Sequence, residues 1–325
     1  MVTITTLCHQ YLGQNLWLAD GTQQAAERSC KYLAEAIGNK RIDRVNPMDS
    51  ETYKGWLLKT GRSKATANLY LRSVHRVFQW SVETLGLLPE NPIAVRQFRV
   101  TATPVRVYTD EEFARMMRCV PDSRWAAMLL IGRTTGLRRA EVLNLRFENV
   151  RDGCVWVEPK RRTIDGWEWE PKDHEIRRVP LVEAVADAMA VRRGELPATQ
   201  PYPNLTPRQY ARMLELQSAG VLTRRRRNLP DNNFRRTFLS IQRAAFGRQI
   251  GDFHQLRKTY ATDMIDVLPV HSVAKLTGHA SIRTLVTHYL HSRESSLEIA
   301  REKASDGIKN APHPFALSRK EVLAG

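Results

Sequence analysis

Residues 125–145 read WAAMLLIGRTTGLRRAEVLNL, an apolar run that is followed by a glycine and then by a second helical pattern. A run that is apolar on all sides is typical of a helix buried in a protein core. Gly136 predicts a turn at the end of this helix. The stretch therefore predicts two consecutive helices, with Arg138 placed directly after the turn between them.

The residues that follow change from helical to strand character and back again. The segment CVWVEPKRRTIDGWEWEPKDHEIRRVPL, residues 154–181, is rich in β-branched residues and tryptophan and is broken at Asp165 and Gly166. Such runs predict two or three antiparallel strands. Helical periodicity returns in LVEAVADAMAV, and the proline-rich stretch 197–207 predicts a surface loop. The expected fold class is mainly α with a small antiparallel β-sheet.

The first 97 residues show helical periodicity and few strand signals. Four segments place apolar residues three or four positions apart, and we expect a helix in each. Residues 98–108, FRVTATPVRVY, have no helical period and predict an extended linker. Thr109 and Glu112 then form a capping box, which marks the start of a second folded unit. The predicted parts are a first domain at 1–97, a linker at 98–108, a second domain at 109–305 and a tail at 306–325.

The chain is strongly basic, with 50 Lys and Arg against 34 Asp and Glu, a net charge of +16 and a pI near 10.0. This excess predicts a polyanionic partner, and nucleic acid fits best. Both halves are basic, so two tethered units can each contribute phosphate contacts around a duplex. No apolar run approaches the roughly 18 residues of a membrane-spanning helix, and the N-terminus lacks the pattern of a signal peptide. We expect a cytoplasmic protein without a membrane partner.

The cysteines and histidines give no pattern of metal binding. The four cysteines are widely scattered and form no C-x-x-C pair: Cys8, Cys30, Cys119 and Cys154. Neither a structural zinc site nor a disulfide framework is expected, and a reduced cytosolic setting is the simplest interpretation. His288 and His291 have helical spacing but no carboxylate or cysteine cluster nearby. We therefore expect no metal and no cofactor.

Two arginine-bearing motifs offer groups that can bind a phosphate. Arg138 is followed three residues later by Glu141, and a guanidinium there can present a fork of donors to two phosphate oxygens. The alternative is an ordinary ion pair on a helix surface. His254 and Arg257 in HQLR share one face of a helix, where a single phosphate can meet both. The alternative is a solvated helix face.

The last motif adds a candidate nucleophile, and the predicted hairpin adds a lysine. His279 and Tyr289 belong to LTGHASIRTLVTHYLH, in which the tyrosine is either a nucleophile or a core or interface residue. Lys172 is the favoured hairpin lysine, because PKDHEIRRVPL places it beyond a turn that returns into a strand end. Lys160, inside KRR, is typical of a phosphate-contacting charge cluster.

In this order, TTGLRRAEVLNL, HQLRKTYATDM and LTGHASIRTLVTHYLH resemble the three signature boxes of the tyrosine recombinase family, the phage-type integrases. The resemblance covers residues 109–293. It implies catalytic roles for Arg138, Lys172, His254, Arg257, His279 and the nucleophile Tyr289, with Glu141 in support. Many relatives have TKTGK where this chain has PKDHE at 171–175, which leaves open whether His174 assists or replaces the lysine.

The resemblance also implies a fold, an activity and partners. It implies a helical core-binding domain that binds DNA, followed by an α+β catalytic domain. The implied enzyme is a site-specific DNA recombinase or integrase that works through a 3′-phosphotyrosyl intermediate without metal or ATP. Its expected partners are double-stranded DNA with a specific recombination site and further copies of itself in a homotetramer, associated with the nucleoid. Two alternatives remain: a topoisomerase IB-like DNA-relaxing enzyme and a catalytically silent DNA-binding relative.

The C-terminal segment and the genetic origin are less defined by the sequence. Residues after about 293 contain one more amphipathic pattern. In the resembled family this segment often docks on a neighbouring protomer, and the alternative is a helix packed on its own domain. The sequence leaves open whether the gene belongs to a phage, a plasmid, an integrative element or a chromosome.

Overall fold

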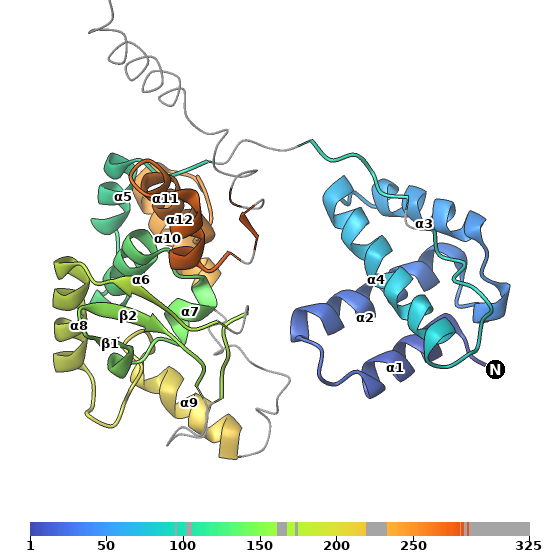
Figure 1. The fold of residues 1–325 in the computed structure, drawn as a ribbon, viewed down its shortest axis with the longest axis horizontal. Helices are drawn as coiled ribbons and strands as arrows, with labels where there is room; N and C mark the ends of the chain where they lie inside the picture. Colours follow the sequence, from blue (N-terminus) through green and yellow to red (C-terminus); the bar gives the residue numbers. More distant parts are fainter. Residues whose placement is uncertain are drawn as a thin grey trace, which may run out of the picture. The chain divides into compact units, whose positions relative to one another are not determined.

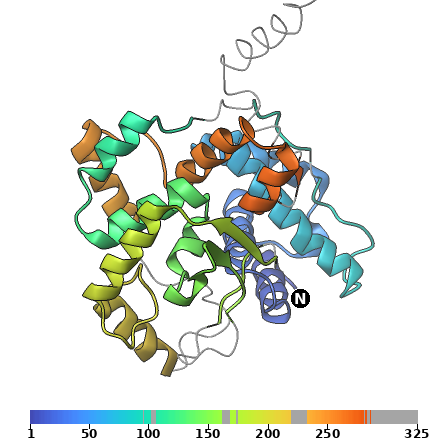
Figure 2. The same cartoon turned by 60° about the vertical axis from the view of Figure 1, so that its left-hand side comes forward.

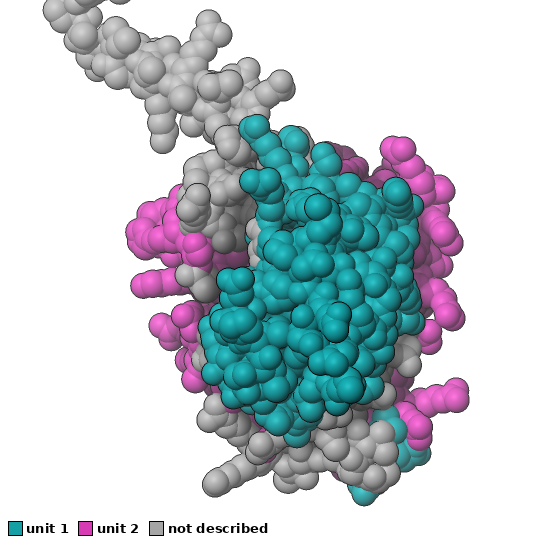
Figure 3. All heavy atoms as spheres, turned by 90° about the vertical axis from the view of Figure 1, so that its right-hand side faces the viewer, with its two compact units in different colours: residues 1–103, 215–227 teal, residues 104–214, 228–325 magenta. Residues whose placement is uncertain are grey.

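The computed structural model describes residues 1–94, 96–101, 106–160, 168–172, 175–218 and 233–279, together with residues 281, 282 and 285. The chain divides into two compact units, residues 1–103 with 215–227 and residues 104–214 with 228–325 (Figure 3). The division after residue 103 lies inside the stretch 98–108. The assignment of 215–227 to the first unit has no counterpart in the sequence-based division.

The first unit is built from helices that pack around α2. In chain order its elements are α1 (Ile4–Gln14), α2 (Asp20–Ile37), the 3-10 turn η1 (Ile42–Arg44), α3 (Pro47–Lys59) and α4 (Lys64–Glu83) (Figure 1). Helix α2 packs against α1, α3 and α4. Four apolar side chains of α4 are fully buried, as in an amphipathic helix: Leu71, Val74, Val77 and Phe78. The four helices expected in this part of the chain are present.

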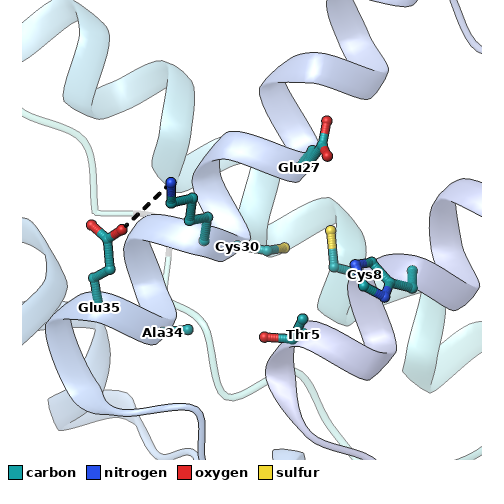
Figure 4. A pocket seen from close by; sticks show the side chains of 8 residues that line it. Thr5, Cys8, Glu27, Cys30, Ala34 and Glu35 are labelled. Carbon is teal, nitrogen blue, oxygen red and sulfur yellow. Dashed lines mark ion pairs between the residues drawn. The ribbon is translucent and has the colours of Figure 1, made fainter.

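A hollow of about 360 Å³ opens between α1 and α2 (Figure 4). The buried thiols of Cys8 and Cys30 line it from the two helices. A hydrogen bond from the Cys30 thiol lowers the pKa of Cys8, while the same bond together with burial raises the pKa of Cys30. Lys31 and Glu35 form an ion pair at 3.9 Å on the α2 side of the hollow. Both thiols are free cysteines within the core of this unit.

The second unit combines helices with a small sheet. From residue 104 onwards the elements are α5 (Asp110–Met117), α6 (Ser123–Thr135), α7 (Arg139–Leu143), η2 (Phe147–Asn149), β1 (Val150–Arg151), β2 (Cys154–Val157), β3 (Arg177–Pro180), α8 (Glu183–Glu195), α9 (Pro207–Ser218), α10 (Phe234–Phe246), α11 (His254–Ile265) and α12 (Val270–Thr277). The strands follow the order β1-β2-β3, and both pairs are antiparallel. The predicted fold class is confirmed. The break predicted at Asp165 and Gly166 lies outside the described residues.

Two of the predicted helix starts and stops in this unit are confirmed. Helix α5 begins at the capping box, where Thr109 Oγ1 accepts from the Glu112 N–H and the Glu112 carboxylate accepts from the Thr109 N–H, both at 3.2 Å. Helix α6 ends at Gly136, which has a left-handed backbone with φ +63°. In the described part of the chain, none of the helices combines the length and apolar character needed to cross a membrane.

Close packing of α6 against α11 brings distant segments together. Trp125 of α6 is fully buried, as expected for this helix. A Cβ added at Gly132 would lie 3.0 Å from Leu256, and one at Gly136 would lie 2.4 Å from the ring of Tyr260. At Gly136 this approach of α11 therefore requires glycine, and at Gly132 a Cβ would require the Leu256 side chain to shift. Helix α12 packs beside α11 and also contacts β3, so the ends of α6, α11 and α12 lie near one another (Figure 2).

Candidate active site

Arg138 stands at the start of α7 and is tied to a buried carboxylate. Its backbone N–H donates to Glu141 Oε2 at 2.7 Å, and its Nη1 donates to Glu141 Oε1 at 2.9 Å. Glu141 is only 3% exposed, so the alternative of an ion pair on a helix surface is wrong. The side chain of Arg138 is 20% exposed. A molecule in solvent can therefore reach the guanidinium, while its position is fixed from within.

Arg257 lies on α11 and is buried, with 1% of its surface exposed. Its Nη1 donates to the carbonyl oxygen of Gly136 at 2.9 Å. This carbonyl lies at the C-terminal end of α6, where the aligned peptide dipoles favour a cation. The alternative of a solvated helix face is therefore wrong for Arg257.

The carbonyl oxygen of Gly278 joins the two arginines. It accepts hydrogen bonds from Arg138 Nη2 at 2.5 Å and from Arg257 Nη2 at 3.5 Å. Gly278 ends α12 in a left-handed conformation with φ +63°, which turns the chain toward His279. Two donor forks are thus held side by side at the ends of α6 and α12. Paired guanidinium forks of this kind suit the oxygens of a phosphate group.

His279 contacts Arg257 and has a defined tautomer. Thr277 Oγ1 donates its single proton to the Val273 carbonyl at 2.6 Å, and it also lies 2.6 Å from His279 Nδ1. Because the hydroxyl proton is already used, Nδ1 must carry the hydrogen and donate it to Thr277. His279 Nε2 then accepts from Arg257 Nη2 at 3.4 Å. His279 therefore belongs to the arginine cluster, as the sequence predicted.

His254 is the first residue of α11 and is exposed. The protein around it still desolvates the ring, and this lowers its pKa below the ordinary 6.5 together with the positive charges of Arg257, Lys258 and Arg138. These effects outweigh the opposite influence of Asp252. The imidazole is thus neutral at pH 7 and can accept a proton. His254 lies three residues before Arg257 on α11, so the two side chains share one side of the helix.

Glu141 stays ionised although it is buried. Burial by itself raises the pKa of its carboxyl, but hydrogen bonds from Arg177 and the charges of Arg177 and Arg138 outweigh this and lower the pKa below 4.5. An ionised carboxylate in a protein interior must be paired and hydrogen-bonded. Glu141 meets that requirement through two arginines rather than one.

Arg177, the first residue of β3, was not among the predicted site residues. Its Nη1 and Nη2 donate to the two oxygens of Glu141 at 3.0 and 2.5 Å, and its Nε donates to the Leu276 carbonyl at 3.0 Å. A signal for this was present in the sequence. Side chains two positions apart share one face of a strand, and Val179 is fully buried. The buried face of β3 therefore includes Arg177.

The two hairpin lysines lie in different environments. Lys160 is 5% exposed, its backbone pairs with Trp169, and its Nζ donates to Asn149 Oδ1. Burial lowers its pKa to about 8. Lys160 is therefore a buried side chain bonded to Asn149, while its interpretation as part of a phosphate-contacting charge cluster stays a prediction. Lys172 is exposed in a turn, and its catalytic role stays a prediction.

Several predicted residues lie outside the described part of the chain. They are His174, His288, Tyr289, His291 and the tail at 306–325. Among the residues that the structure does describe, no group of three or more His, Cys, Asp or Glu side chains is placed to hold a metal ion. The described cluster thus consists of Arg138, Glu141, Arg177, Arg257 and His279, with His254 beside it.

Known protein sequences resemble parts of this chain. The model of the phage integrase family matches residues 106–296, which include the whole described cluster. A protein described as tyrosine recombinase XerC-like, from Caldanaerobacter subterraneus subsp. tengcongensis, is 24% identical over 285 residues, 79% of this chain and 70% of the relative. The ICEBs1 integrase of Bacillus subtilis is 21% identical over 140 residues, 39% of this chain and 38% of that protein.

Solved structures share the fold at low identity. The Tn1549 transposon integrase in complex with transposon right end DNA has a TM-score of 0.69 and 17% identity, covering 94% of this chain and 100% of that one. A lambda integrase dimer bound to a COC′ core site has a TM-score of 0.65 and 14% identity, covering 86% and 96%. A lambda integrase tetramer bound to a Holliday junction has a TM-score of 0.63 and 15% identity, covering 87% and 77%.

Proposed function

The chain belongs to the phage integrase family and is a tyrosine-type site-specific DNA recombinase, and we propose that it cuts and rejoins double-stranded DNA through a 3′-phosphotyrosyl intermediate. The observation that carries this mechanism is the meeting of Arg138 and Arg257 at the carbonyl of Gly278. Two fixed guanidiniums, one of them reachable from solvent, form a site for a single phosphate.

The two arginines can stabilise the negative charge that develops during the reaction. Attack on a phosphodiester builds negative charge on the nonbridging oxygens, and fixed positive donors aimed there lower the barrier. Arg138 and Arg257 are that pair in this proposal. The Gly136 and Gly278 carbonyls and Glu141 already hold them in place, so little reorganisation is needed when the phosphate arrives. His279 keeps the Arg257 fork oriented.

The proposed chemistry exchanges one phosphoester for another. A bond forms between the phenolic oxygen of Tyr289 and phosphorus, while the bond from phosphorus to the deoxyribose 5′ oxygen breaks. Neutral His254 accepts the phenol proton, and Lys172 gives a proton to the departing 5′ oxygen. Because the new phosphoester is similar in energy to the old one, attack by a 5′ hydroxyl of another strand reseals the DNA without ATP.

Strand exchange between two duplexes requires several active sites at once, and we propose a homotetramer on DNA. The dimeric and tetrameric DNA complexes of lambda integrase support assemblies of this type for the shared fold. In this proposal the helical unit at 1–97 binds the core site, residues 306–325 dock on a neighbouring protomer, and the protein works at the nucleoid. The net charge of +16 favours such a DNA-bound state.

Recombination between two DNA fragments tests this function against its alternatives. Fragments of the genomic DNA that flanks the gene are the first substrates to try, in pairs with distinguishable lengths. Recombinant products of the predicted size support the proposal. Relaxation of any supercoiled plasmid without such products indicates a topoisomerase-like enzyme instead. DNA binding without cleavage indicates a silent relative and overturns the proposal.

A further inference from the structure

Arg177 completes a buried group of three charged side chains at the edge of the candidate site. Arg138, Glu141 and Arg177 have side chains that are 20%, 2% and 8% exposed. Each oxygen of Glu141 accepts two hydrogen bonds. Oε1 accepts from Arg138 Nη1 and Arg177 Nη1, and Oε2 accepts from the Arg138 N–H and Arg177 Nη2. The carboxylate therefore has no remaining acceptor position for a second side-chain N–H of Arg138.

We propose that Arg177 is a positioning residue for DNA cleavage: by occupying one side of the Glu141 carboxylate, it keeps the Arg138 guanidinium from pairing fully with Glu141 and holds it at the Gly278 carbonyl, where the phosphate would bind. This inference rests on the proposed function. Arg177 acts through Glu141 and Arg138 and does not itself touch the DNA.

The geometry explains why a third group is needed. A carboxylate and a guanidinium alone favour a bidentate pair with two parallel N–H···O bonds. Such a pair would turn a second N–H of Arg138 toward Glu141 and away from the Gly278 carbonyl, which it now meets at 2.5 Å. The bidentate partner of Glu141 is Arg177 instead, at 3.0 and 2.5 Å. Arg138 gives Glu141 only one side-chain hydrogen bond.

Charge leads to the same conclusion. Two arginines around one carboxylate leave the group with a net charge of +1, and this excess lies beside Gly278 and Arg257. Without Arg177, the remaining pair of Arg138 and Glu141 would be neutral, and the positive potential offered to a phosphate would fall. Loss of Arg177 would also raise the pKa of Glu141, because Arg177 contributes the main effects that now lower it.

Arg177 also fixes Gly278, whose carbonyl accepts from both Arg138 and Arg257. Its Nε holds the Leu276 carbonyl in the last turn of α12 at 3.0 Å. A Cβ at Gly278 would lie 3.0 Å from Arg177 Nη1, so the guanidinium packs directly against Gly278. Through the Arg177 side chain, strand β3 thereby helps to fix the position of the Gly278 carbonyl.

A double-variant experiment separates positioning from simple structural support. The assay is single-turnover formation of the Tyr289 adduct on a suicide DNA site, with DNA at saturating concentration so that binding and cleavage are measured apart. We expect Arg177→Met to slow cleavage by about 100-fold, the size of effect that a small misplacement of a reacting group produces, with a much smaller change in DNA affinity. Arg178→Met is the matched control, because Arg178 is the next residue of β3 and is exposed, and its cleavage rate should stay near that of the wild type.

The decisive variant combines Arg177→Met with Glu141→Gln. A neutral amide cannot form the charged bidentate pair with Arg138, so the double variant should cleave at least about tenfold faster than Arg177→Met alone, a coupling within the range of contacting residues. A purely structural tie between β3 and α12 predicts no such recovery.

Each outcome bears on the inference. If Arg177→Met cleaves at the wild-type rate, or if the double variant is no faster than the single one, Arg177 is not a positioning residue. If Arg177→Met does not fold, Arg177→Lys provides the test: it keeps the charge but loses the fork, and we expect about tenfold slower cleavage, whereas an unchanged rate overturns the inference. If the wild type forms no adduct at all, the proposed function fails and this inference fails with it.

Discussion

Arg138 and Arg257 donate to one acceptor, the carbonyl oxygen of Gly278, at 2.5 and 3.5 Å. Two guanidinium groups that share one acceptor carry like charges, and they repel each other unless negative potential is supplied nearby. The carbonyls at the ends of α6 and α12 supply part of it, and the ionised Glu141 supplies the rest. The positive charge of the site is therefore organised before any phosphate binds.

Replacing Arg138 by lysine should distinguish the effect of its positive charge from the effect of its arrangement of N–H donors. Lys keeps the positive charge but lacks the rigid, planar fork of donors by which Arg138 reaches Glu141 and Gly278 together. We expect cleavage to slow by about 100- to 1,000-fold, as for loss of one fixed donor in other active sites, while DNA binding changes little. Single-turnover cleavage and a separate binding titration measure the two effects. Cleavage by Arg138→Lys at the wild-type rate would show that a point charge is sufficient.

Gly278→Ala should destabilise the second unit. Gly278 has φ +63°, and a Cβ there would lie 3.0 Å from Arg177. The left-handed conformation alone costs a residue with a Cβ about 1–2 kcal/mol. Denaturant unfolding measures the loss. Gly194→Ala in α8 is the matched control, because a Cβ there meets nothing within 4 Å, and it should leave stability equal or raise it by about 0.5–1 kcal/mol.

The sequence predicted the elements better than it predicted the contacts between them. Periodicity and capping boxes located α4, α5 and α6, because these signals are local. The burial of Glu141 could not be foreseen from Arg138 and Glu141 alone, since a spacing of three residues fits a surface pair equally well. The role of Gly278 is carried by its backbone carbonyl, which has no sequence signature. The burial of Lys160 could not be foreseen because a run of basic residues suggests exposure, whereas its partner Asn149 lies eleven positions away.

The pH dependence of cleavage should report His254. Its pKa is lowered from 6.5 by desolvation and by Arg257, Lys258 and Arg138, so the neutral, proton-accepting form persists as the pH falls to 6.5. We expect a cleavage rate that is constant around neutral pH and declines only below pH 6.5, when the ring becomes protonated. His254→Gln should be slow and should lack this acid limb. An acid limb with its midpoint above 6.5, or one that His254→Gln retains, would contradict the assignment.

A DNA substrate with a better leaving group should identify the general acid. Lys172→Ala should slow cleavage of ordinary DNA by about 100- to 10,000-fold, the usual contribution of a general acid. A site with sulfur in place of the bridging 5′ oxygen needs no proton donor, so Lys172→Ala should cleave it at nearly the wild-type rate. Lys160→Met is the control, and we expect it to reduce stability because Lys160 is buried against Asn149. If rescue by sulfur appears with Lys160→Met and not with Lys172→Ala, the two lysines have been assigned the wrong way round.

The most direct test is whether Tyr289 becomes covalently joined to DNA. The protein is incubated with a nicked suicide site, denatured and digested, and the DNA-linked peptide is identified by mass spectrometry. We predict that the wild type carries a 3′-phosphate of DNA on the peptide containing Tyr289, and that Tyr289→Phe gives no adduct although it binds the same DNA. An adduct formed by Tyr289→Phe, or one located on another residue of the wild type, would contradict the account.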